Sequence, residues 1–355
     1  MRQNDPTVRW LLEGDAAIRW QVLRDLAKKS KRVVEREQQR VAKTGWGARL
    51  LELQEPNGQW GGGIYTPKWI STTYTMALLR QLGLPPKQPQ ALKACALLFD
   101  RGFHRDGGFN CWRSYDYSET CVTGMLLDVA AYFQFADDRV HAFAEFLLKQ
   151  QMGDGGWNCQ SQRGATHSSF HTTILALEGL LEYERFIPRH AAEIRRAQAG
   201  GREFLLVHRL FRSHRTGNVV NSAMTRFSFP PRWHFDILRG LDYFRQAGAS
   251  RDPRLSEAID IVRQRRKNDG RWILQNRYPG KVFFEMEKLG QPSRWNTLRA
   301  LRVLRWWGSK KQPGSDALVD SATQETKVLN LPSSLVYHRR CGLGPPLRSQ
   351  LIPSS

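Results

Sequence analysis

The chain has 355 residues, of which 54 are Lys or Arg and 33 are Asp or Glu, and its formal charge of +21 would attract phosphates, polyanions or anionic membrane surfaces. A single repeat-built domain can reach this length. Basic runs with interleaved stacking aromatics are missing, which argues against sequence-specific nucleic-acid binding. Five scattered cysteines, no secretory signal after Met1 and no long apolar run predict a reduced, cytoplasmic protein without a transmembrane segment.

Two helices are expected within residues 1–43, over residues 16–27 and 32–42. From residue 44 onward a Gly-rich turn that ends in an aromatic residue recurs along the chain. Clear copies lie at residues 57–60, 106–109, 154–157 and 269–272, with a degenerate copy at residues 215–218. Such regular spacing is typical of a repeat architecture.

An amphipathic helical run precedes each turn, for example over residues 142–151 and 255–266, and a second helix follows. The interiors of the second helices are apolar on most sides, so they belong in an inner layer, whereas the first helices belong outside. Their expected starts, four of which offer a Ser as N-cap, lie near Ser71, Ser118, Ser168, Pro231 and Ser293.

Five helix pairs that recur at roughly 50- to 60-residue intervals predict an all-α fold, a closed or nearly closed α/α barrel over residues 44–308. The helices of residues 1–43 would supply a sixth pair and close the barrel. Residues 309–355 are rich in Ser, Pro, Gly and Gln without periodicity, and we expect them to form a disordered tail.

Three ligand-type side chains, Cys121, His171 and His234, occupy one position of the repeat, each two residues before a Thr or Asp. If the repeats wind around a common axis, these side chains converge, and a thiolate with two imidazoles suits zinc. The first and fifth copies hold Thr73 and Trp295 there, so the site would be one-sided and open to substrate. A buried structural cysteine and hydrogen-bonded core histidines are the alternative interpretation.

Two carboxylates accompany this set. Glu119 could be a fourth metal ligand, or a general acid or base. Asp236 could take part in catalysis by orienting His234. The helix dipole is expected to lower the pKa of the Cys121 thiol.

Four arginines in loops that lead into the second helices are candidates for a diphosphate site, because Arg grips phosphate bidentately: Arg163, Arg215, Arg226 and Arg294. Aromatic residues in the same loops, among them Trp112, Trp157 and Trp233, could line an apolar chamber that binds substrate and shields a carbocation. Ordinary surface charge and packing between turns are the alternatives.

The turns at residues 54–60 and 151–157, each with a Gln before the Gly-rich stretch and a final Trp, resemble the QW motifs of squalene and hopene cyclases. Residues 171–180, His-Thr-Thr-Ile-Leu-Ala-Leu-Glu-Gly-Leu, are similar to the zinc-histidine helix of protein prenyltransferase β subunits. The resemblance covers roughly residues 45–307 and implies the six-hairpin α/α toroid that both groups share.

Within that resemblance, Glu119-Thr-Cys121 and His171 match the prenyltransferase zinc pattern, with Glu in place of the usual Asp, and imply zinc as cofactor. His234 is not part of that ligand set. The general-acid tetrad of the cyclases is missing, and only Glu119 takes a comparable place.

The leading hypothesis is a metal-dependent enzyme that acts on an isoprenoid or other long apolar substrate in a central cavity. A metal-free terpene cyclase or isomerase with Glu119 as general acid is the first alternative. A non-catalytic toroid that binds a lipid or peptide is the second. Prenyltransferase β subunits work with a partner subunit, and the sequence does not show whether this chain has one.

Overall fold

A computed structural model describes residues 5–112, 114–186 and 189–309. These residues are mostly helical and belong to one compact unit, as an all-α fold class requires. Apart from isolated β-bridges, the β structure of these residues is a two-stranded antiparallel sheet of β1 (Trp272–Ile273) and β2 (Pro292–Ser293). Nearly all of the tail predicted over residues 309–355 lies outside the described residues.

The N-terminal helices confirm the prediction of two helices within residues 1–43 and add a short one before them. Asp5 and Asp15 begin the first two helices, because their carboxylates accept hydrogen bonds from backbone N–H groups of the first turn. The elements are α1 (Pro6–Leu12), α2 (Ala16–Asp25), α3 (Lys31–Gln39) and the 3₁₀ turn η1 (Arg40–Ala42).

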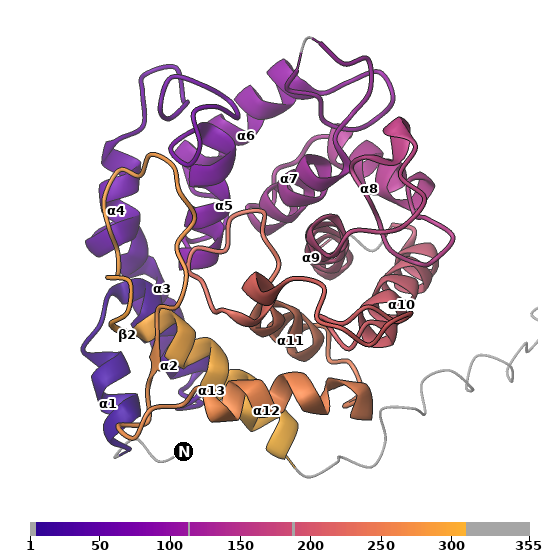
Figure 1. Cartoon of the computed structure of the whole chain (residues 1–355). Helices are drawn as coiled ribbons and strands as arrows, with labels where there is room; N and C mark the ends of the chain where they lie inside the picture. Colours follow the sequence, from indigo (N-terminus) through magenta and orange to yellow (C-terminus); the bar gives the residue numbers. More distant parts are fainter. Residues whose placement is uncertain (1–4, 113, 187–188, 310–355) are drawn as a thin grey trace, which may run out of the picture. The chain divides into compact units, whose positions relative to one another are not determined.

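Helix pairs follow, as the repeat predicts (Figure 1). The first helices of the pairs are α4 (Gly45–Glu52), α6 (Pro89–Gly102), α8 (Arg139–Lys149), α10 (Ala191–Val207) and α12 (Ser256–Gln264). The second helices are α5 (Thr72–Leu82), α7 (Thr120–Tyr132), α9 (Phe170–Phe186), α11 (Ile237–Gln246) and α13 (Arg294–Gly308). Short 3₁₀ turns lie in the connections at η2 (Ser161–Arg163), η3 (Ser222–Thr225) and η4 (Pro253–Leu255).

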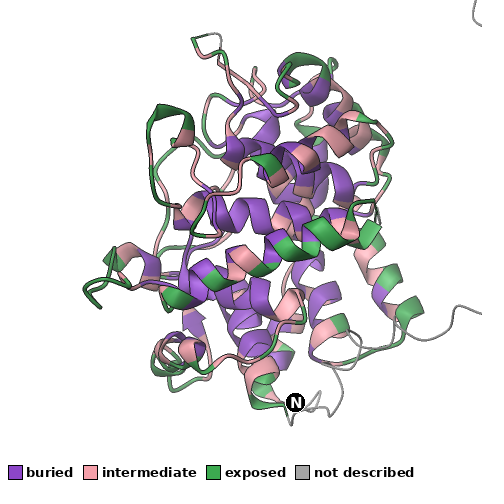
Figure 2. Ribbon diagram, turned by 90° about the vertical axis from the view of Figure 1, so that its right-hand side faces the viewer, coloured by how far each residue is buried: buried purple, intermediate pink, exposed green. Residues whose placement is uncertain are grey.

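Burial separates the two sets of helices. In α7 every residue is buried except Cys121, Asp128 and Tyr132, whereas α12 buries only one apolar stripe. Figure 2 shows helices that are buried around most of their surface packed behind helices with an exposed face. The second helices are therefore an inner layer, as their apolar sequences predict.

Neighbouring inner helices contact one another in chain order from α5 to α13, and α2 contacts α13. The middle of α2 also bonds the end of α5, because Trp20 Nε1 donates to Leu82 O at 2.9 Å and Gln21 Nε2 donates to Gln81 O at 3.2 Å. The N-terminal segment thus adds one helix to the inner layer, between α13 and α5.

The recurrent turns share one hydrogen-bond pattern. The indole Nε1 of Trp60, Trp157 and Trp272 donates to the carbonyl oxygen ten residues earlier, at 2.7–2.8 Å. The backbone N–H of each turn aromatic, Phe109 included, donates to a threonine hydroxyl at the start of the next helix, at 2.9–3.0 Å. Each turn is therefore fixed to both helices of its pair.

The serines near the inner-helix starts were expected to be N-caps, and for two of them this is wrong. Ser118 N and Oγ donate to Asp106 at 2.8 and 2.6 Å, and Ser168 bonds Asp154 in the same way. The turn carboxylate holds the serine, so α7 and α9 begin two residues later. Ser293 does cap α13, since its Oγ accepts from Asn296 N at 3.0 Å.

None of the helices in the described ranges is both long and apolar enough to span a bilayer.

Candidate functional site

Glu119 lies at the N-cap position of α7, and its half-buried carboxylate turns away from the helix. Trp112 Nε1 donates to its Oε1 at 2.8 Å. Burial raises the pKa of the Glu119 carboxyl, while the Trp112 bond and the positive charges of Lys68 and Arg163 oppose that rise. Glu119 is thus a carboxyl that can hold and release a proton closer to neutral pH than an exposed glutamate.

Cys121 is the second residue of α7 and forms a side-chain hydrogen bond with Cys159, a residue that the sequence analysis did not select. That bond and burial raise the pKa of the Cys121 thiol, so the expected lowering by the helix dipole is wrong for this residue. The same bond lowers the pKa of Cys159 instead. Cys159 lies two residues after Trp157, and its contact with Cys121 is evident only in the folded structure.

His171, at the start of α9, is neutral at pH 7, because burial and the nearby Arg239 charge lower its pKa to about 4. Its Nδ1 accepts a hydrogen bond from the backbone N–H of Phe235 at 2.8 Å. A neutral imidazole that accepts at Nδ1 carries its proton on Nε2, so Nε2 is a donor.

His234 lies flat between two aromatic rings, Trp233 and Tyr278, each with its centroid 3.6 Å away. Burial and the neighbouring His171 and Arg239 lower its pKa to about 3. The His171 and His234 rings are perpendicular, with centroids 5.5 Å apart. The structure therefore brings the two histidines together, as the repeat predicts.

The zinc prediction needs Cys121 to join these histidines. No group of three or more His, Cys, Asp or Glu side chains with a geometry for metal is found in the described part of the chain. Cys121 bonds Cys159, and His171 has one nitrogen occupied and the other protonated. The residues as placed do not fit a zinc ion, and zinc binding stays a prediction from sequence.

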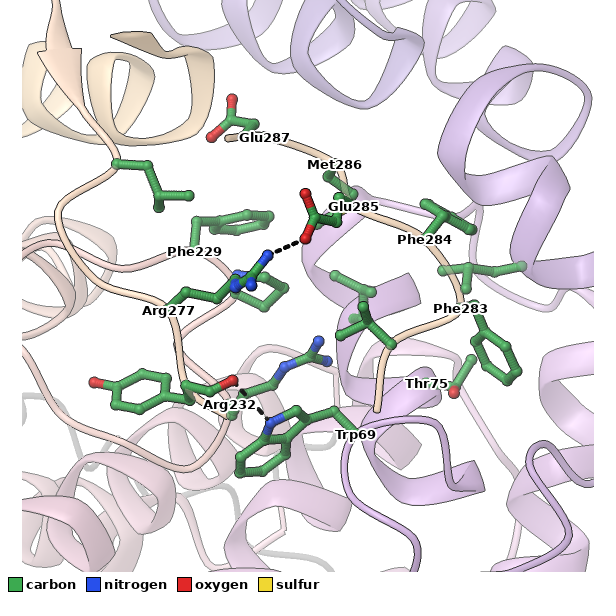
Figure 3. A pocket seen from close by; sticks show the side chains of 16 residues that line it. Trp69, Thr75, Phe229, Arg232, Arg277, Phe283, Phe284, Glu285, Met286 and Glu287 are labelled. Atoms are coloured by element: carbon green, nitrogen blue, oxygen red, sulfur yellow. Dashed lines mark hydrogen bonds and ion pairs between the residues drawn. The ribbon is translucent and has the colours of Figure 1, made fainter. Parts of the chain in front are cut away.

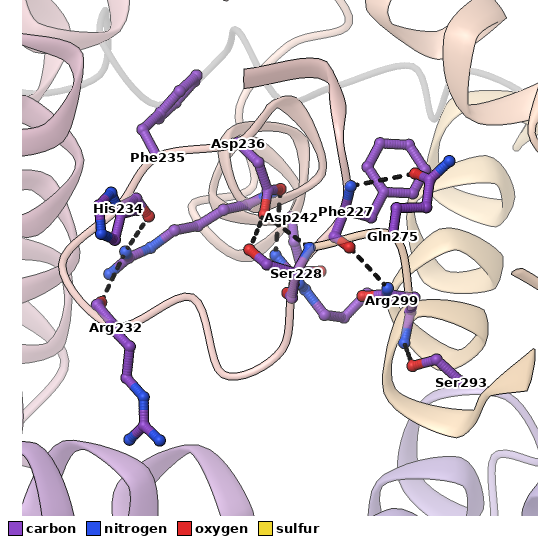
Figure 4. A network of polar contacts seen from close by, with 12 residues as sticks. Phe227, Ser228, Arg232, His234, Phe235, Asp236, Asp242, Gln275, Ser293 and Arg299 are labelled. Carbon is purple, nitrogen blue, oxygen red and sulfur yellow. Dashed lines mark hydrogen bonds and ion pairs between the residues drawn. The ribbon is translucent and has the colours of Figure 1, made fainter. Parts of the chain in front are cut away.

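Asp236 is fully buried and bonds Ser228 and Arg239 rather than the His234 ring, so its predicted role in orienting that ring is wrong (Figure 4). Its carboxylate accepts from Ser228 Oγ at 3.0 Å and caps α11 by accepting from Arg239 N at 2.8 Å. His234 is positioned by Arg239, whose Nη1 donates to the His234 carbonyl at 2.7 Å. Asp236 thus anchors the loop that carries His234 but does not bond its ring.

The predicted tryptophans divide between the site and the core. Trp112 bonds Glu119, and Trp233 lies 5.2 Å from the His171 ring and stacks on His234. Trp157 has no exposed surface and holds its turn, so its predicted place in a substrate chamber is wrong.

The four predicted diphosphate arginines lie apart from one another. Arg163, Arg215 and Arg226 are exposed, and the guanidinium of Arg163 stacks on Tyr115 at 4.1 Å. Arg294 stacks on Trp10 at 4.5 Å and donates to its carbonyl. Their role in binding a diphosphate stays a prediction. Two other cations, Lys68 and Arg232, lie at the aromatic side chains of the candidate site.

Lys68 and a contiguous aromatic wall complete the site. The Lys68 Nζ lies 5.6–5.7 Å from the ring centroids of Tyr65, Trp69 and Trp233. Trp112 meets Tyr65 edge to face at 5.6 Å, which joins the wall to Glu119. The sequence analysis missed Lys68, because a single lysine in a loop carries no pattern.

A pocket lined mainly by apolar side chains, Trp69 among them, holds about 680 Å³ of empty space, part of which is open to solvent (Figure 3). Its apolar walls come from α4, α5 and the loops before α11 and β2, and they include Leu50, Leu78, Phe229, Leu274, Phe284 and Met286. Arg232 also lines the pocket, and Figure 3 shows its guanidinium among these side chains.

Arg232 has no hydrogen-bond partner for its buried Nη1 among the described residues. Burial lowers the pKa of Arg232 to about 10, a value at which it still carries its charge at neutral pH. Its guanidinium lies 5.5 Å from the Trp69 ring, so Arg232 and Lys68 flank the same indole.

Comparison of the chain with models of known protein families gives no match, and comparison with curated proteins gives none either.

Proposed function

We propose that this protein is an enzyme of the α/α-toroid kind that acts on an amphipathic substrate, an isoprenoid or similar apolar chain with an anionic head. The succession of inner helices from α2 through α13 and the shared bonds of the turns support the toroid. The resemblance of the turns to QW motifs and of residues 171–180 to a prenyltransferase helix supports the substrate class.

The observation that carries the proposal is the guanidinium of Arg232, whose buried Nη1 has no partner among the described residues, beside an apolar pocket. A buried cation without a partner is costly, and an anionic ligand would remove that cost. The apolar walls would take up the chain of the ligand, with about 25 cal/mol gained per Å² of apolar surface buried. The Lys68 ammonium, which also lies near the Trp69 ring, would add positive charge for the same head group.

Glu119 would supply the acid. When its carboxyl is protonated it can transfer that proton from its Oε2 to a substrate double bond or leaving group, and return to the carboxylate that Trp112 stabilises. Positive charge that develops on the substrate would face the rings of Tyr65, Trp69 and Trp233, which already attract the Lys68 ammonium. His171 would offer its Nε2 proton as a hydrogen-bond donor.

Calorimetric titration with farnesyl diphosphate, farnesol and inorganic diphosphate tests the proposal. We expect farnesyl diphosphate to bind at least tenfold more tightly than either part alone, a difference of about 1.4 kcal/mol or more. Arg232→Met should remove that advantage and leave farnesol binding unchanged. Arg263→Met, an exposed arginine paired with Asp260, is the matched control.

Equal affinity for farnesyl diphosphate and farnesol, or an unaltered Arg232→Met variant, would overturn the proposal. Tight binding without conversion of the ligand would favour the non-catalytic lipid-binding toroid. Metal content of protein purified without added zinc tests the metal-dependent form, which requires about one ion per chain and its loss in Cys121→Ala.

A further inference from the structure

A second pocket lies among the inner helices and holds about 1010 Å³ of empty space, part of which is open to solvent. Its lining comes from α2, α5, α7, α9, α11 and α13, mostly from their C-terminal halves, and from Phe229 and Pro231 in the loop before α11. Seven arginines and four carboxylates line it, namely Arg24, Arg80, Arg185, Arg239, Arg245, Arg299, Arg302, Asp128, Glu178, Glu182 and Asp242.

Most of these charges are paired within the wall. Arg80 bonds Asp128 and Glu182 at 2.9 and 3.0 Å, and Arg239 forms a two-pronged pair with Glu178. Elsewhere in the wall, Arg24 pairs with Asp25, Arg185 with Glu182, and Arg245 with Asp242. The carboxylates of the pocket are thus already occupied.

Two arginines of α13 are less well matched. Arg299 donates to Ser228 O at 3.0 Å, and its nearest carboxylate, Asp236, lies 3.7 Å away and is already bonded to Ser228 and Arg239. Arg302 meets Asp25 and Gln21 through Nη2, but its buried Nε has no partner.

These arginines share one face of α13 with Trp295, whose indole is a second unpaired donor beside Arg302 Nε. Trp295, Arg299 and Arg302 are spaced by four and three residues, which places them in one row along the helix. Their exposed fractions are 2%, 6% and 6%, and the buried Nε1 of Trp295 also lacks a partner. All three side chains line the pocket and offer only N–H donors.

A ligand that satisfies this row must supply acceptors and negative charge, and must be small enough for a walled pocket. We infer that this pocket among the inner helices binds a small oxyanion, a phosphate or polycarboxylate group, through Trp295, Arg299 and Arg302. The carboxylates around it are paired with arginines of the wall, which limits their repulsion of the anion. This site goes beyond the proposed function, because it shares none of Arg232, Lys68 and Glu119.

Calorimetry and thermal unfolding of the full-length protein with inorganic phosphate or citrate test the inference, with sodium chloride at equal ionic strength as reference. We expect one of the two anions to bind with a measurable Kd and to raise Tm beyond the chloride reference. Tighter phosphate binding would assign a phosphate ligand, and tighter citrate binding a polycarboxylate.

Trp295→Phe removes the Nε1 donor and keeps an aromatic ring, although a smaller one, and Arg302→Lys keeps the charge and removes Nε. Each is expected to weaken anion binding at least fivefold, while Arg263→Met, at an exposed arginine outside both pockets, leaves it unchanged. If neither anion binds more tightly than chloride, or if both row variants bind as wild type does, the row is only a structural ion-pair network and the inference fails.

Discussion

At the scale of single residues, hydrogen bonds decide the chemistry that is open to the site. Trp112 holds the Glu119 carboxylate toward the aromatic wall, and the Phe235 N–H makes His171 a donor at Nε2. Cys121 keeps its proton because it bonds Cys159. Residue type alone predicts Cys121 and His171 as metal ligands, and in the structure both form hydrogen bonds to other protein groups.

Glu119→Gln tests the proposed acid. The amide keeps the size of the side chain and can still accept from Trp112, but it cannot give up a proton. We expect turnover of an isoprenyl diphosphate to fall at least about 100-fold in kcat, with KM changed less than threefold. Glu193→Gln on the exposed face of α10 is the control, and an undiminished kcat in Glu119→Gln would assign the proton transfer to another group.

The two histidines make stability depend on pH. Their pKa values in the folded protein, about 4 and about 3, lie below the ordinary 6.5, so the unfolded chain binds more protons below pH 6.5. Their stabilising contribution is present above pH 6.5 and is lost as pH falls toward 4, by about 1–2 kcal/mol per histidine at pH 5.

Urea unfolding of wild type and of the double variant His171→Gln, His234→Phe at pH 7 and pH 5 measures this effect. The wild type should lose more free energy of unfolding than the variant between the two values. Equal losses of unfolding free energy in the wild type and the variant would show that the folded protein does not keep the two histidines neutral.

At the scale of elements, the turns and the inner-helix contacts fix where the site residues lie. The turns carry glycine at a position with φ of 82–94°, a conformation that other residues adopt only with strain. Helices α7 and α9 approach through Gly124 and Gly179, where a Cβ on Gly179 would lie 2.4 Å from Gly124 O. This close contact sets the separation between Cys121 and His171.

Gly179→Ala should therefore destabilise the protein by about 1–3 kcal/mol, because the backbones must move apart. Thermal unfolding followed by circular dichroism would show the loss. The matched control is Gly153→Ala, where an added Cβ meets no atom within 4 Å and φ is not positive. Equal Tm values for the two variants would contradict the close contact.

At the scale of the described unit, α2 completes the inner layer although it comes first in the chain. Trp20 Nε1 bonds Leu82 O, and the Trp20 ring covers Gly83, whose Cβ position lies 2.1 Å from it. Gln21 joins α5 to Arg302 of α13. The N-terminal segment is thus part of the fold that holds both pockets.

Trp20→Ala is expected to cost about 3–5 kcal/mol of unfolding free energy, with one cooperative transition retained. Leu53→Ala, at a side chain that is 44% exposed, should cost less than about 1 kcal/mol. Two separate unfolding transitions in Trp20→Ala, or a loss of unfolding free energy similar to that of Leu53→Ala, would show that α2 is not an integral part of the fold.

Sequence alone determined the repeat, the helix pairs and the layer to which each helix belongs, because turn glycines, aromatics and apolar periodicity act locally. It also predicted that His171 and His234 lie together, since equivalent positions of neighbouring repeats converge. The predicted register was wrong for the first copy of the repeat. There the backbone N–H of Trp60 donates to Thr72, so the residue equivalent to Cys121 is Ile70 and not Thr73.

Tertiary structure decided what those positions do. Several properties depend on segments that are far away in the chain. These are the thiol partner of Cys121, the position of the proton on His171, the burial of Asp236 and Trp157, and the unpaired Nη1 of Arg232. Hydrogen-bond partners and desolvation set the charge and reactivity of a side chain, and both arise only when the chain has folded.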